Sequence, residues 1–453
     1  MTVKNDAVVE TSKPAKRISD EALTPVPANK RQHWIVPAMI FGGLEFSIPV
    51  LLTGALLATH FGISKIFWIL FVTLFVIQWI GNAVAGYMGA KTGVSSSVIA
   101  RSSFGHVQAR WIIGLITFFV GLGWWALQTA VTGEAIAAML GVDYQNNFLM
   151  LALITTICGL IFAIPSVLGY SSMKWTDIIA VPAGLLLIVT GVYLVMKDSG
   201  GASIMAWDPT PGITVLAAIS LILGMNVSQW VGVQDYTRYA KPKIKDNILI
   251  PLGIIGVGFP LFLVGAIMSV GAGEADIVLI MMGLGFPVWG FLILWLSTWT
   301  SQIVNSYSMG LSMANMLNVN SSKGRALLTL LGIALGLVLA LGGILQYFEN
   351  FLYISGIIYG PIAGVMIADF FFIRKQTYKD NPGWNWVATF AMGVGVWFAY
   401  WTQYVNEMGI PAVQALFVSL FLYLIGMKVK QKMKPDQFTE IDSEYEQIIG
   451  KVE

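Results

Sequence analysis

The chain has 453 residues, of which 56% are hydrophobic and only 11% are charged, and its formal net charge is +2. This composition excludes an ordinary soluble domain and predicts an all-α polytopic membrane protein. The single cysteine, Cys158, lies in an apolar run, which excludes a disulfide framework and a thiolate metal site.

The two ends of the chain are polar. Residues 1–33 lack the apolar core of a signal peptide, and their Lys, Pro, Glu and Ser content predicts a disordered cytoplasmic tail. Residues 429–453 are predicted to form a second cytoplasmic tail.

Between the tails, about 20 apolar residues per crossing predict twelve transmembrane helices. The predicted spans are 34–59, 66–89, 110–140, 147–170, 174–196, 211–236, 247–272, 286–317, 325–347, 350–373, 386–405 and 410–428. Residues 91–106 are too polar to span, and they predict a surface or re-entrant piece.

The basic residues indicate the orientation. With twelve spans, the loops that follow even-numbered spans lie on the same side of the membrane as both ends of the chain. Of the 26 lysines and arginines, 24 fall on that side, and the exceptions are Lys65 and Lys197. Because basic loops are retained in the cytoplasm, both termini are predicted to be cytoplasmic. The short loops are typical of a cytoplasmic (inner) membrane protein.

The first span is interrupted at mid-depth. Residues 41–54 read FGGLEFSIPVLLTG, with Glu45 and Pro49 where plain hydrocarbon is expected. A carboxylate at the bilayer centre costs roughly 2.5–3.5 kcal/mol, and proline removes a backbone donor. Such a helix is stable only where it faces a protein-lined or watery cavity. We therefore expect half of a midplane binding site here.

The sixth span has a matching interruption, GMNVSQWVG, at residues 224–232. Two interrupted helices five spans apart indicate an inverted-repeat transporter whose site lies between them. The predicted repeats are residues 34–196 and 211–373, and residues 386–428 add two helices.

Two further spans carry polar residues that suit a common cavity. Trp124 and Gln128 in the third span share a helix face, although a tryptophan there is also typical of a lipid interface. In the eighth span, Ser297 and Ser301 share a face beside Thr300, and Asn305 lies a turn further on. These hydroxyls suit Na⁺, or they bond only to their own helix carbonyls.

Glu45 has three readings: a carboxylate bonded to the loosened backbone, a counter-ion for a cationic substrate, or a proton-coupling group. Asp235, Arg238 and Asp369, at helix ends, are interpreted as structural. The chain has no catalytic, nucleotide-binding or metal-spacing motif, which argues against an enzyme. A single midplane cluster favours a transporter over a channel.

Several motifs resemble the nucleobase–cation symport family, specifically the purine and cytosine permeases. They are GYMGAKTG (86–93), ARSSFG (100–105), GLGWW (121–125), DYTRY (235–239), WTSQIVNSYSMGL (299–311) and GVMIAD (364–369). The resemblance implies a five-plus-five inverted-repeat, leucine-transporter-like core with alternating access, usually coupled to Na⁺ or H⁺.

The same resemblance implies particular ligands. The Na⁺ site would use the backbone carbonyls of Gly43 and Phe46 and the hydroxyls of Thr300 and Ser301. The implied substrate pocket contains Gly123, Trp124, Ser228, Gln229 and Ser297, and the hydantoin-type relatives add Gln128 and Asn305.

The chain departs from the cytosine permeases at four positions. Asn226 replaces an aromatic residue, Gly121 and Ser297 replace amides, and Glu45 replaces a small polar residue. Removing a stacking face and two hydrogen-bonding partners, each worth on the order of 1 kcal/mol, favours a smaller, less aromatic or cationic substrate.

The sequence thus predicts a secondary symporter that imports a small nitrogenous compound with Na⁺, most simply a nucleobase (cytosine- or purine-like) or related heterocycle. The alternative substrate is a small cationic amine, amidine or guanidine compound recognised by Glu45. Asn226 is also a candidate substrate-binding residue. We expect no cofactor, no nucleic acid and no obligate protein partner, and H⁺ is the alternative coupling ion.

Overall fold

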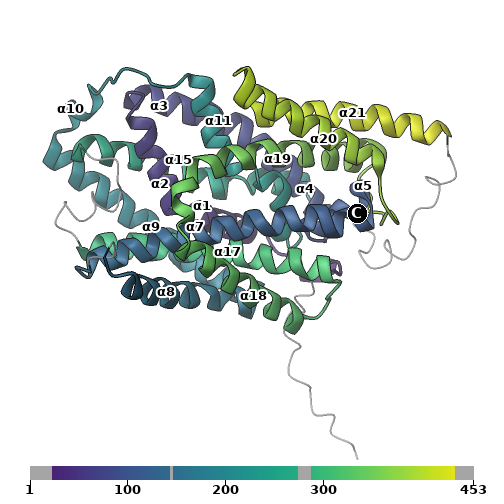
Figure 1. Ribbon diagram of the computed structural model, residues 1–453, viewed down its shortest axis with the longest axis horizontal. Coiled ribbons are helices and arrows are strands. Elements are labelled where there is room, and N and C mark those ends of the chain that lie inside the picture. Colours follow the sequence, from purple (N-terminus) through teal and green to yellow (C-terminus); the bar gives the residue numbers. More distant parts are fainter. Residues whose placement is uncertain (1–22, 143–145, 274–286, 434–453) are drawn as a thin grey trace, which may run out of the picture.

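The computed structural model describes residues 23–142, 146–273 and 287–433, and within α9 and the start of α17 it describes the backbone alone at some positions. The described chain is helical. Its longest helices run roughly parallel to the long axis of the molecule (Figure 1).

Eight helical segments of the described chain are long and apolar enough to cross a bilayer, and a bent pair makes a ninth. The eight segments are Ile63–Thr92, His106–Met139, Phe148–Leu168, Val215–Thr237, Ile244–Ala272, Ser322–Leu341, Ile344–Ile373 and Pro411–Met433. The three helices α9 (Tyr170–Ser199), α17 (Pro287–Leu317) and α20 (Trp386–Tyr400) lie where further spans were predicted.

The ninth segment is broken, as the sequence predicted. Helix α1 (Ile35–Glu45) ends at Glu45, α2 (Ile48–Ala58) begins at Ile48, and their axes meet at 57°. Ser47 is extended between them, with φ −145° and ψ 152°. Pro49 occupies the first turn of α2, where its missing N–H costs no helical hydrogen bond.

The sixth span is divided more gently. Helix α11 (Val215–Asn226) ends at Asn226, a turn follows, and α12 (Gln229–Gly232) and α13 (Gln234–Thr237) continue the same apolar run. At the break, the carbonyl oxygen of Asn226 accepts a hydrogen bond of 3.1 Å from Gln78 Nε2, which lies on another span. Gln78 ends a π-helical segment, η2 (Phe71–Gln78), between α3 (Ile63–Leu70) and α4 (Trp79–Thr92).

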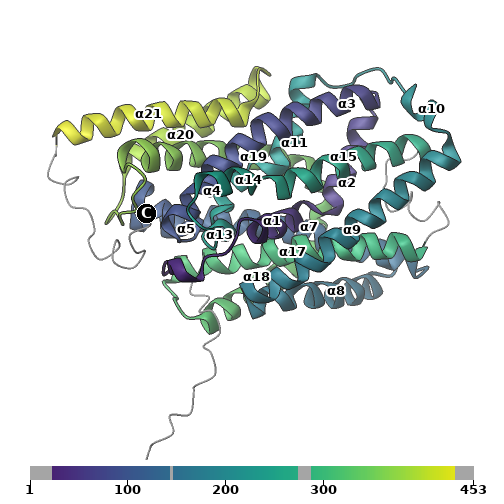
Figure 2. The same cartoon turned by 180° about the vertical axis from the view of Figure 1, so that it is seen from behind.

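The helices pack around α7 (Gly114–Met139), which runs through the centre of the molecule. Helices α8 (Phe148–Leu168) and α18 (Ser322–Leu341) cover one side of it, and α20 and α21 (Pro411–Met433) lie on the opposite side, beyond α19 (Phe348–Ala368) (Figures 1 and 2). This arrangement brings α7, α17, α1 and α11 together around one central volume.

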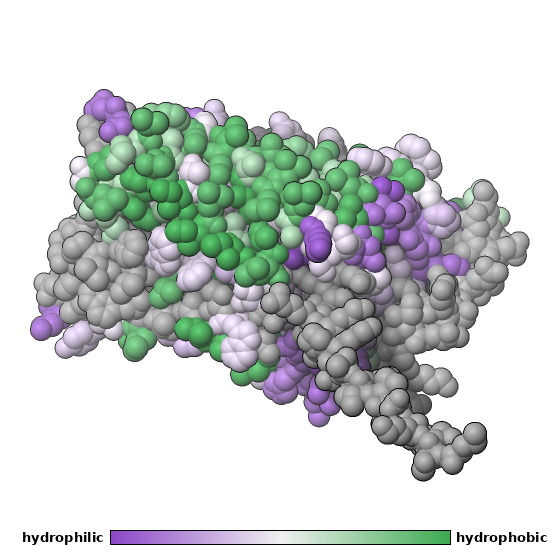
Figure 3. Space-filling view, turned by 90° about the horizontal axis from the view of Figure 1, so that it is seen from below, coloured by the Kyte–Doolittle hydropathy of each residue, from purple (hydrophilic) through white to green (hydrophobic). Residues whose placement is uncertain are grey.

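The outer surface is apolar where α8 and α18 face outward. Large side chains such as Leu149, Ile157, Leu168, Leu327 and Val338 are exposed there. Figure 3 shows the apolar surface on this side, with polar side chains gathered toward its ends. A soluble protein rarely exposes such an area, whereas a bilayer covers it.

The end of the molecule where α4 ends and α18 begins is here called the basic end, and Lys91, Lys241 and Lys323 lie there. The segment predicted to be a surface or re-entrant piece forms α5 (Ser96–Phe104), and all nine of its residues are buried. Its partners come from distant spans: Asp235 from α13, Asn315 from α17, Asp369 from η5 (Asp369–Ile373) and Tyr423 from α21.

From residue 23 onward, the structure differs from the disordered N-terminal tail that the sequence predicted. Residues 23–33, here called the N-terminal strap, lie against the basic end: Val26 N donates to Gly93 O (2.9 Å) and Gln32 N donates to Tyr239 O (2.7 Å). Arg31 is only 5% exposed. Backbone hydrogen bonds to the ends of two spans order this polar segment, and hydropathy does not reveal such bonds.

Candidate functional site

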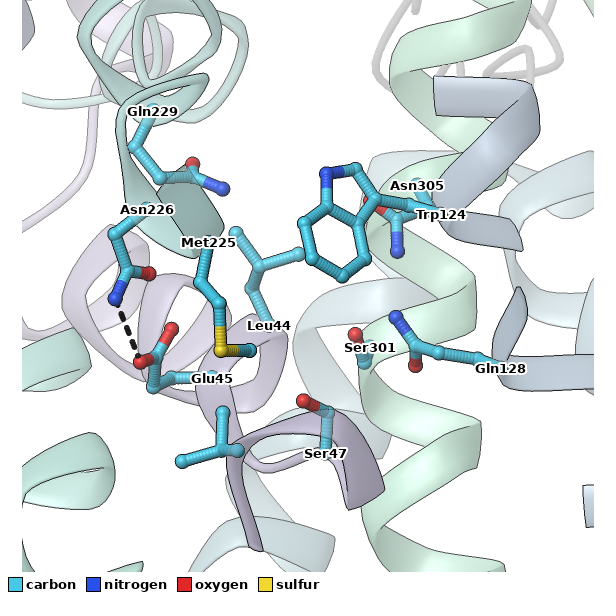
Figure 4. Close-up of a pocket in the computed structure, with 11 residues that line it drawn as sticks. Leu44, Glu45, Ser47, Trp124, Gln128, Met225, Asn226, Gln229, Ser301 and Asn305 are labelled. Atoms are coloured by element: carbon cyan, nitrogen blue, oxygen red, sulfur yellow. Dashed lines mark hydrogen bonds between the residues drawn. The ribbon is translucent and has the colours of Figure 1, made fainter. Parts of the chain in front are cut away.

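A pocket of about 310 Å³ lies where the broken spans face α7 and α17. Figure 4 shows side chains from all four regions converging on it. The lining residues are Leu44, Glu45, Ser47, Val50, Trp124, Gln128, Met225, Asn226, Gln229, Ser301 and Asn305. This pocket is called the central pocket below.

Glu45 is the buried charge-bearing group of the central pocket. It is the last residue of α1 and is 4% exposed. Within the described chain its carboxylate accepts one hydrogen bond, 3.1 Å from Asn226 Nδ2 to Glu45 Oε1 (Figure 4). The carboxylate packs against Gly258 of α15 (Leu252–Ala272), where an added Cβ would lie 2.6 Å from Glu45 Cγ. Gly258 therefore makes the space that Glu45 fills.

Trp124 forms the aromatic wall of the pocket and is 7% exposed. The ring of Phe351 in α19 meets it edge-on, with centroids 5.0 Å apart and planes at 85°. A Cβ at Gly123 would lie 2.4 Å from the Phe351 ring. Gly123 thus lies outside the pocket lining and admits the ring that holds Trp124 in place.

Two buried polar atoms opposite Glu45 have no protein partner among the described residues: Gln128 Oε1 and Ser301 Oγ. Gln128 is 2% exposed and Ser301 is 1% exposed, and both side chains point toward the same region (Figure 4). An unpaired buried polar group costs about 1–3 kcal/mol. Their convergence on a pocket indicates that a ligand satisfies them.

The predicted ion ligands lie between the first span and α17. Thr300 Oγ1 is 3.4 Å from the carbonyl oxygen of Phe46, and it also donates to Leu296 O at 3.1 Å. Gly43 lies in the last turn of α1, whose final carbonyls have no partner within the helix. Ser301 follows Thr300 and faces the central pocket.

Four other predicted substrate-binding residues line pockets. Asn226, Gln229 and Asn305 line the central pocket, and Ser228 lines a neighbouring pocket. Ser297 lies within α17, and its side chain is outside the described part of the chain.

Sequence reasoning missed several contributors. Ser47 and Met225 flank the two breaks and could have been found from that position alone. Gly258 and Phe351 carry no such signal, because only tertiary packing brings α15 and α19 against Glu45 and Trp124.

An apolar helical bundle with a pocket of converging polar groups between two broken spans is the architecture of a membrane transport protein. The chain belongs to the family described as permeases for cytosine/purines, uracil, thiamine and allantoin, whose model matches residues 25–426. It is a multi-pass membrane permease of the nucleobase type, and the resemblance carried by the sequence motifs is confirmed.

The relatives span nearly the whole chain. The cytosine permease of Escherichia coli (strain K12) is 26% identical, covering 92% of this chain and 97% of its own. The allantoin permease of Bacillus subtilis (strain 168) is also 26% identical, covering 93% and 89%.

Solved structures show the same fold. The transporter Mhp1 of the nucleobase-cation-symport-1 family, closed with bromovinylhydantoin bound, superposes with a TM-score of 0.81 at 20% identity, covering 94% of this chain and 99% of its own. A Na⁺-coupled sialic acid symporter in a substrate-bound outward-open state reaches 0.64 at 13% identity, covering 89% and 90%.

Proposed function

We propose that this protein is a secondary active symporter that imports a small nitrogenous compound, a nucleobase or related heterocycle, together with Na⁺. The central pocket carries the proposal. Trp124 offers a planar face, and the amides of Gln128, Gln229 and Asn305 offer both donors and acceptors. A neutral planar compound with both kinds of group satisfies this set.

The Na⁺ site of the proposal uses the carbonyls of Gly43 and Phe46 with the hydroxyls of Thr300 and Ser301. Neutral oxygens are the ligands that hard cations such as Na⁺ accept. The support is the closeness of Thr300 Oγ1 to Phe46 O, 3.4 Å, together with the unpaired Ser301 hydroxyl. An ion there joins α1 to α17 and completes the wall of the central pocket.

The transport cycle we propose is alternating access in a cytoplasmic membrane. Residues 34–196 and 211–373 form two inverted repeats, the chain crosses twelve times, and the basic end faces the cytoplasm with both termini. The broken spans move against the helices that carry Trp124 and Thr300. Ion and compound favour the same conformer, so each raises the affinity of the other.

A second candidate substrate is a small cationic amine, amidine or guanidine compound. Its support is that the described chain contributes one hydrogen bond to the buried Glu45 carboxylate and no cation beside it. A bound cation would neutralise that charge. The amide of Asn226 already bonds to the carboxylate, which favours the neutral compound as the leading proposal.

Uptake into proteoliposomes tests both candidates. We expect an inward Na⁺ gradient to drive accumulation of radiolabelled cytosine or allantoin, and an equal K⁺ gradient to drive none. A proton gradient that replaces the Na⁺ gradient without loss contradicts Na⁺ coupling. Binding without accumulation contradicts transport itself.

The variant Glu45→Gln separates the two substrate classes. A neutral compound should keep its affinity within a few-fold. Guanidine should lose about 2–5 kcal/mol, at least about thirtyfold, because its buried partner charge is removed. Uptake of guanidine alone, abolished by Glu45→Gln, would replace the leading proposal with the second.

A further inference from the structure

A second pocket of about 430 Å³ lies beside the central pocket, toward the basic end. It shares three lining residues with the central pocket: Trp124, Gln229 and Asn305. Those three side chains therefore stand between the two pockets. The other lining residues of the second pocket include Thr117, Gly121, Gly232, Asp235, Tyr236, Ser308 and Ser312.

The two pockets lie in line with each other, because each of three spans contributes one helix face to both. On α7 this face comprises Thr117, Gly121, Trp124 and Gln128, and successive members are three or four residues apart. Such residues lie one above another on a helix. At 1.5 Å per residue the face extends about 16 Å.

The other two spans repeat this spacing. On α17 the face comprises Ser301, Asn305, Ser308 and Ser312, and on the sixth span it comprises Asn226, Gln229, Gly232 and Asp235. Apart from Trp124, every residue of these faces is polar or glycine. Packing alone does not require two adjoining pockets with polar groups along the same three spans.

The wall of the second pocket is preorganised. Tyr236 Oη and Ser308 Oγ are 2.8 Å apart, and Thr117 Oγ1 and Ser312 Oγ are 3.0 Å apart. Gly232 keeps space open: a Cβ there would meet no atom within 4 Å. Polar groups that converge around an open space are the arrangement expected of a small-molecule site.

The carboxylate of Asp235, which lines the second pocket, already has hydrogen-bond partners in the protein. Asp235 Oδ1 accepts hydrogen bonds of 2.8 Å from both the backbone N and the hydroxyl of Ser96, at the start of α5. Arg238 follows Asp235 by three residues on the same span. A neutral ligand therefore fits this wall better than a cation does.

We propose that the second pocket is a separate binding site for the transported compound, a neutral planar molecule bearing both hydrogen-bond donors and acceptors. This inference rests on the proposed function. The compound occupies the central pocket first and the second pocket after passing Trp124, Gln229 and Asn305, and at saturation each pocket holds one molecule.

The stoichiometry of binding tests the inference. Equilibrium dialysis of the purified protein in Na⁺ with radiolabelled cytosine should give two equivalents per chain. Gly232→Leu fills the second pocket without touching the central one and should give one equivalent. The matched control is Gly256→Leu on α15, where an added Cβ also meets nothing within 4 Å; it should keep two. One equivalent for wild type, or no change in Gly232→Leu, overturns the proposal.

A labelling experiment separates failure of this inference from failure of the proposed function. In a Cys158→Ala background, Gly232→Cys should react with a small maleimide and be protected by saturating cytosine. If wild type binds neither cytosine nor allantoin, the proposed function fails. The reaction of the Gly232→Cys thiol with maleimide still tests whether the second pocket is open to water. A reactive thiol supports a water-filled site there, and an unreactive one contradicts it.

Discussion

At the scale of single residues, Glu45 and Gly258 form one unit. The space that the carboxylate occupies exists because α15 has no side chain at this position. Gly258→Ala should force Glu45 away from Asn226 and cost about 1–3 kcal/mol of stability through overpacking. Thermal unfolding of the purified protein measures the loss.

The control for this prediction is Gly256→Ala, two residues away on the same helix, which meets no neighbour. A double variant, Gly258→Ala with Glu45→Ala, should recover most of the stability because the clash is removed. Equal losses in Gly258→Ala and Gly256→Ala would show that Glu45 does not need this space.

A second prediction at this scale concerns Thr300. Thr300→Ala removes the hydroxyl beside the Phe46 carbonyl and should raise the Na⁺ concentration needed for half-maximal cytosine binding by about tenfold, equivalent to about 1.4 kcal/mol. Thr300→Ser keeps the oxygen and should stay close to wild type. An unchanged Na⁺ dependence in Thr300→Ala would remove this residue from the ion site.

Residues that break a pattern could be predicted from the sequence. Glu45 and Asn226 are polar groups in apolar runs, and Trp124 and Gln128 are four residues apart, so each carries a local signal. Gly258 and Phe351 carry none, since an apolar helix contains many glycines and phenylalanines and only the packing of distant helices selects these two.

At the scale of helices, α15 packs tightly along the broken first span through glycines. A Cβ at Gly54 would lie 2.0 Å from Phe262 O, and one at Gly265 would lie 2.1 Å from Leu51 O. Small residues let membrane helices approach closely where no hydrophobic driving force acts between them. The backbone of α2 therefore rests on the backbone of α15.

Gly265→Leu should destabilise the protein by at least about 3 kcal/mol, because the obstructing atoms belong to the backbone and cannot rotate away. Fluorescence-detected size-exclusion chromatography after heating measures the effect, with Gly256→Leu as the control. A heat-stable Gly265→Leu protein would mean that α2 and α15 can separate without loss.

The positions of nine spans of the described chain followed from hydropathy, and the break in the first span followed from Glu45 and Pro49. The burial of α5 could not be derived in this way. Its partners, such as Asp235 and Asp369, come from segments far along the chain, so no local periodicity reports them.

At the scale of the whole molecule, the proposed Na⁺ ligands and the central pocket share α1 and α17, so the two binding events are expected to be coupled. Saturating Na⁺ should raise cytosine affinity by a factor within the usual range of about 5–150, and saturating cytosine should raise Na⁺ affinity by the same factor. Isothermal titration in both orders measures this reciprocity. Unequal factors would mean that another ion or conformer takes part.

The N-terminal strap ties the outer ends of several helices together. Leu23 N donates to Asn320 Oδ1 beyond α17, and Gln32 exchanges backbone hydrogen bonds with Tyr239 and Lys241 beyond α13. Any rotation that parts these ends must first undo the strap or carry it along. A reporter dye attached at residue 23 would therefore detect an opening of the basic end without contacting either pocket. The N-terminal strap is thus a suitable labelling site for following conformational change.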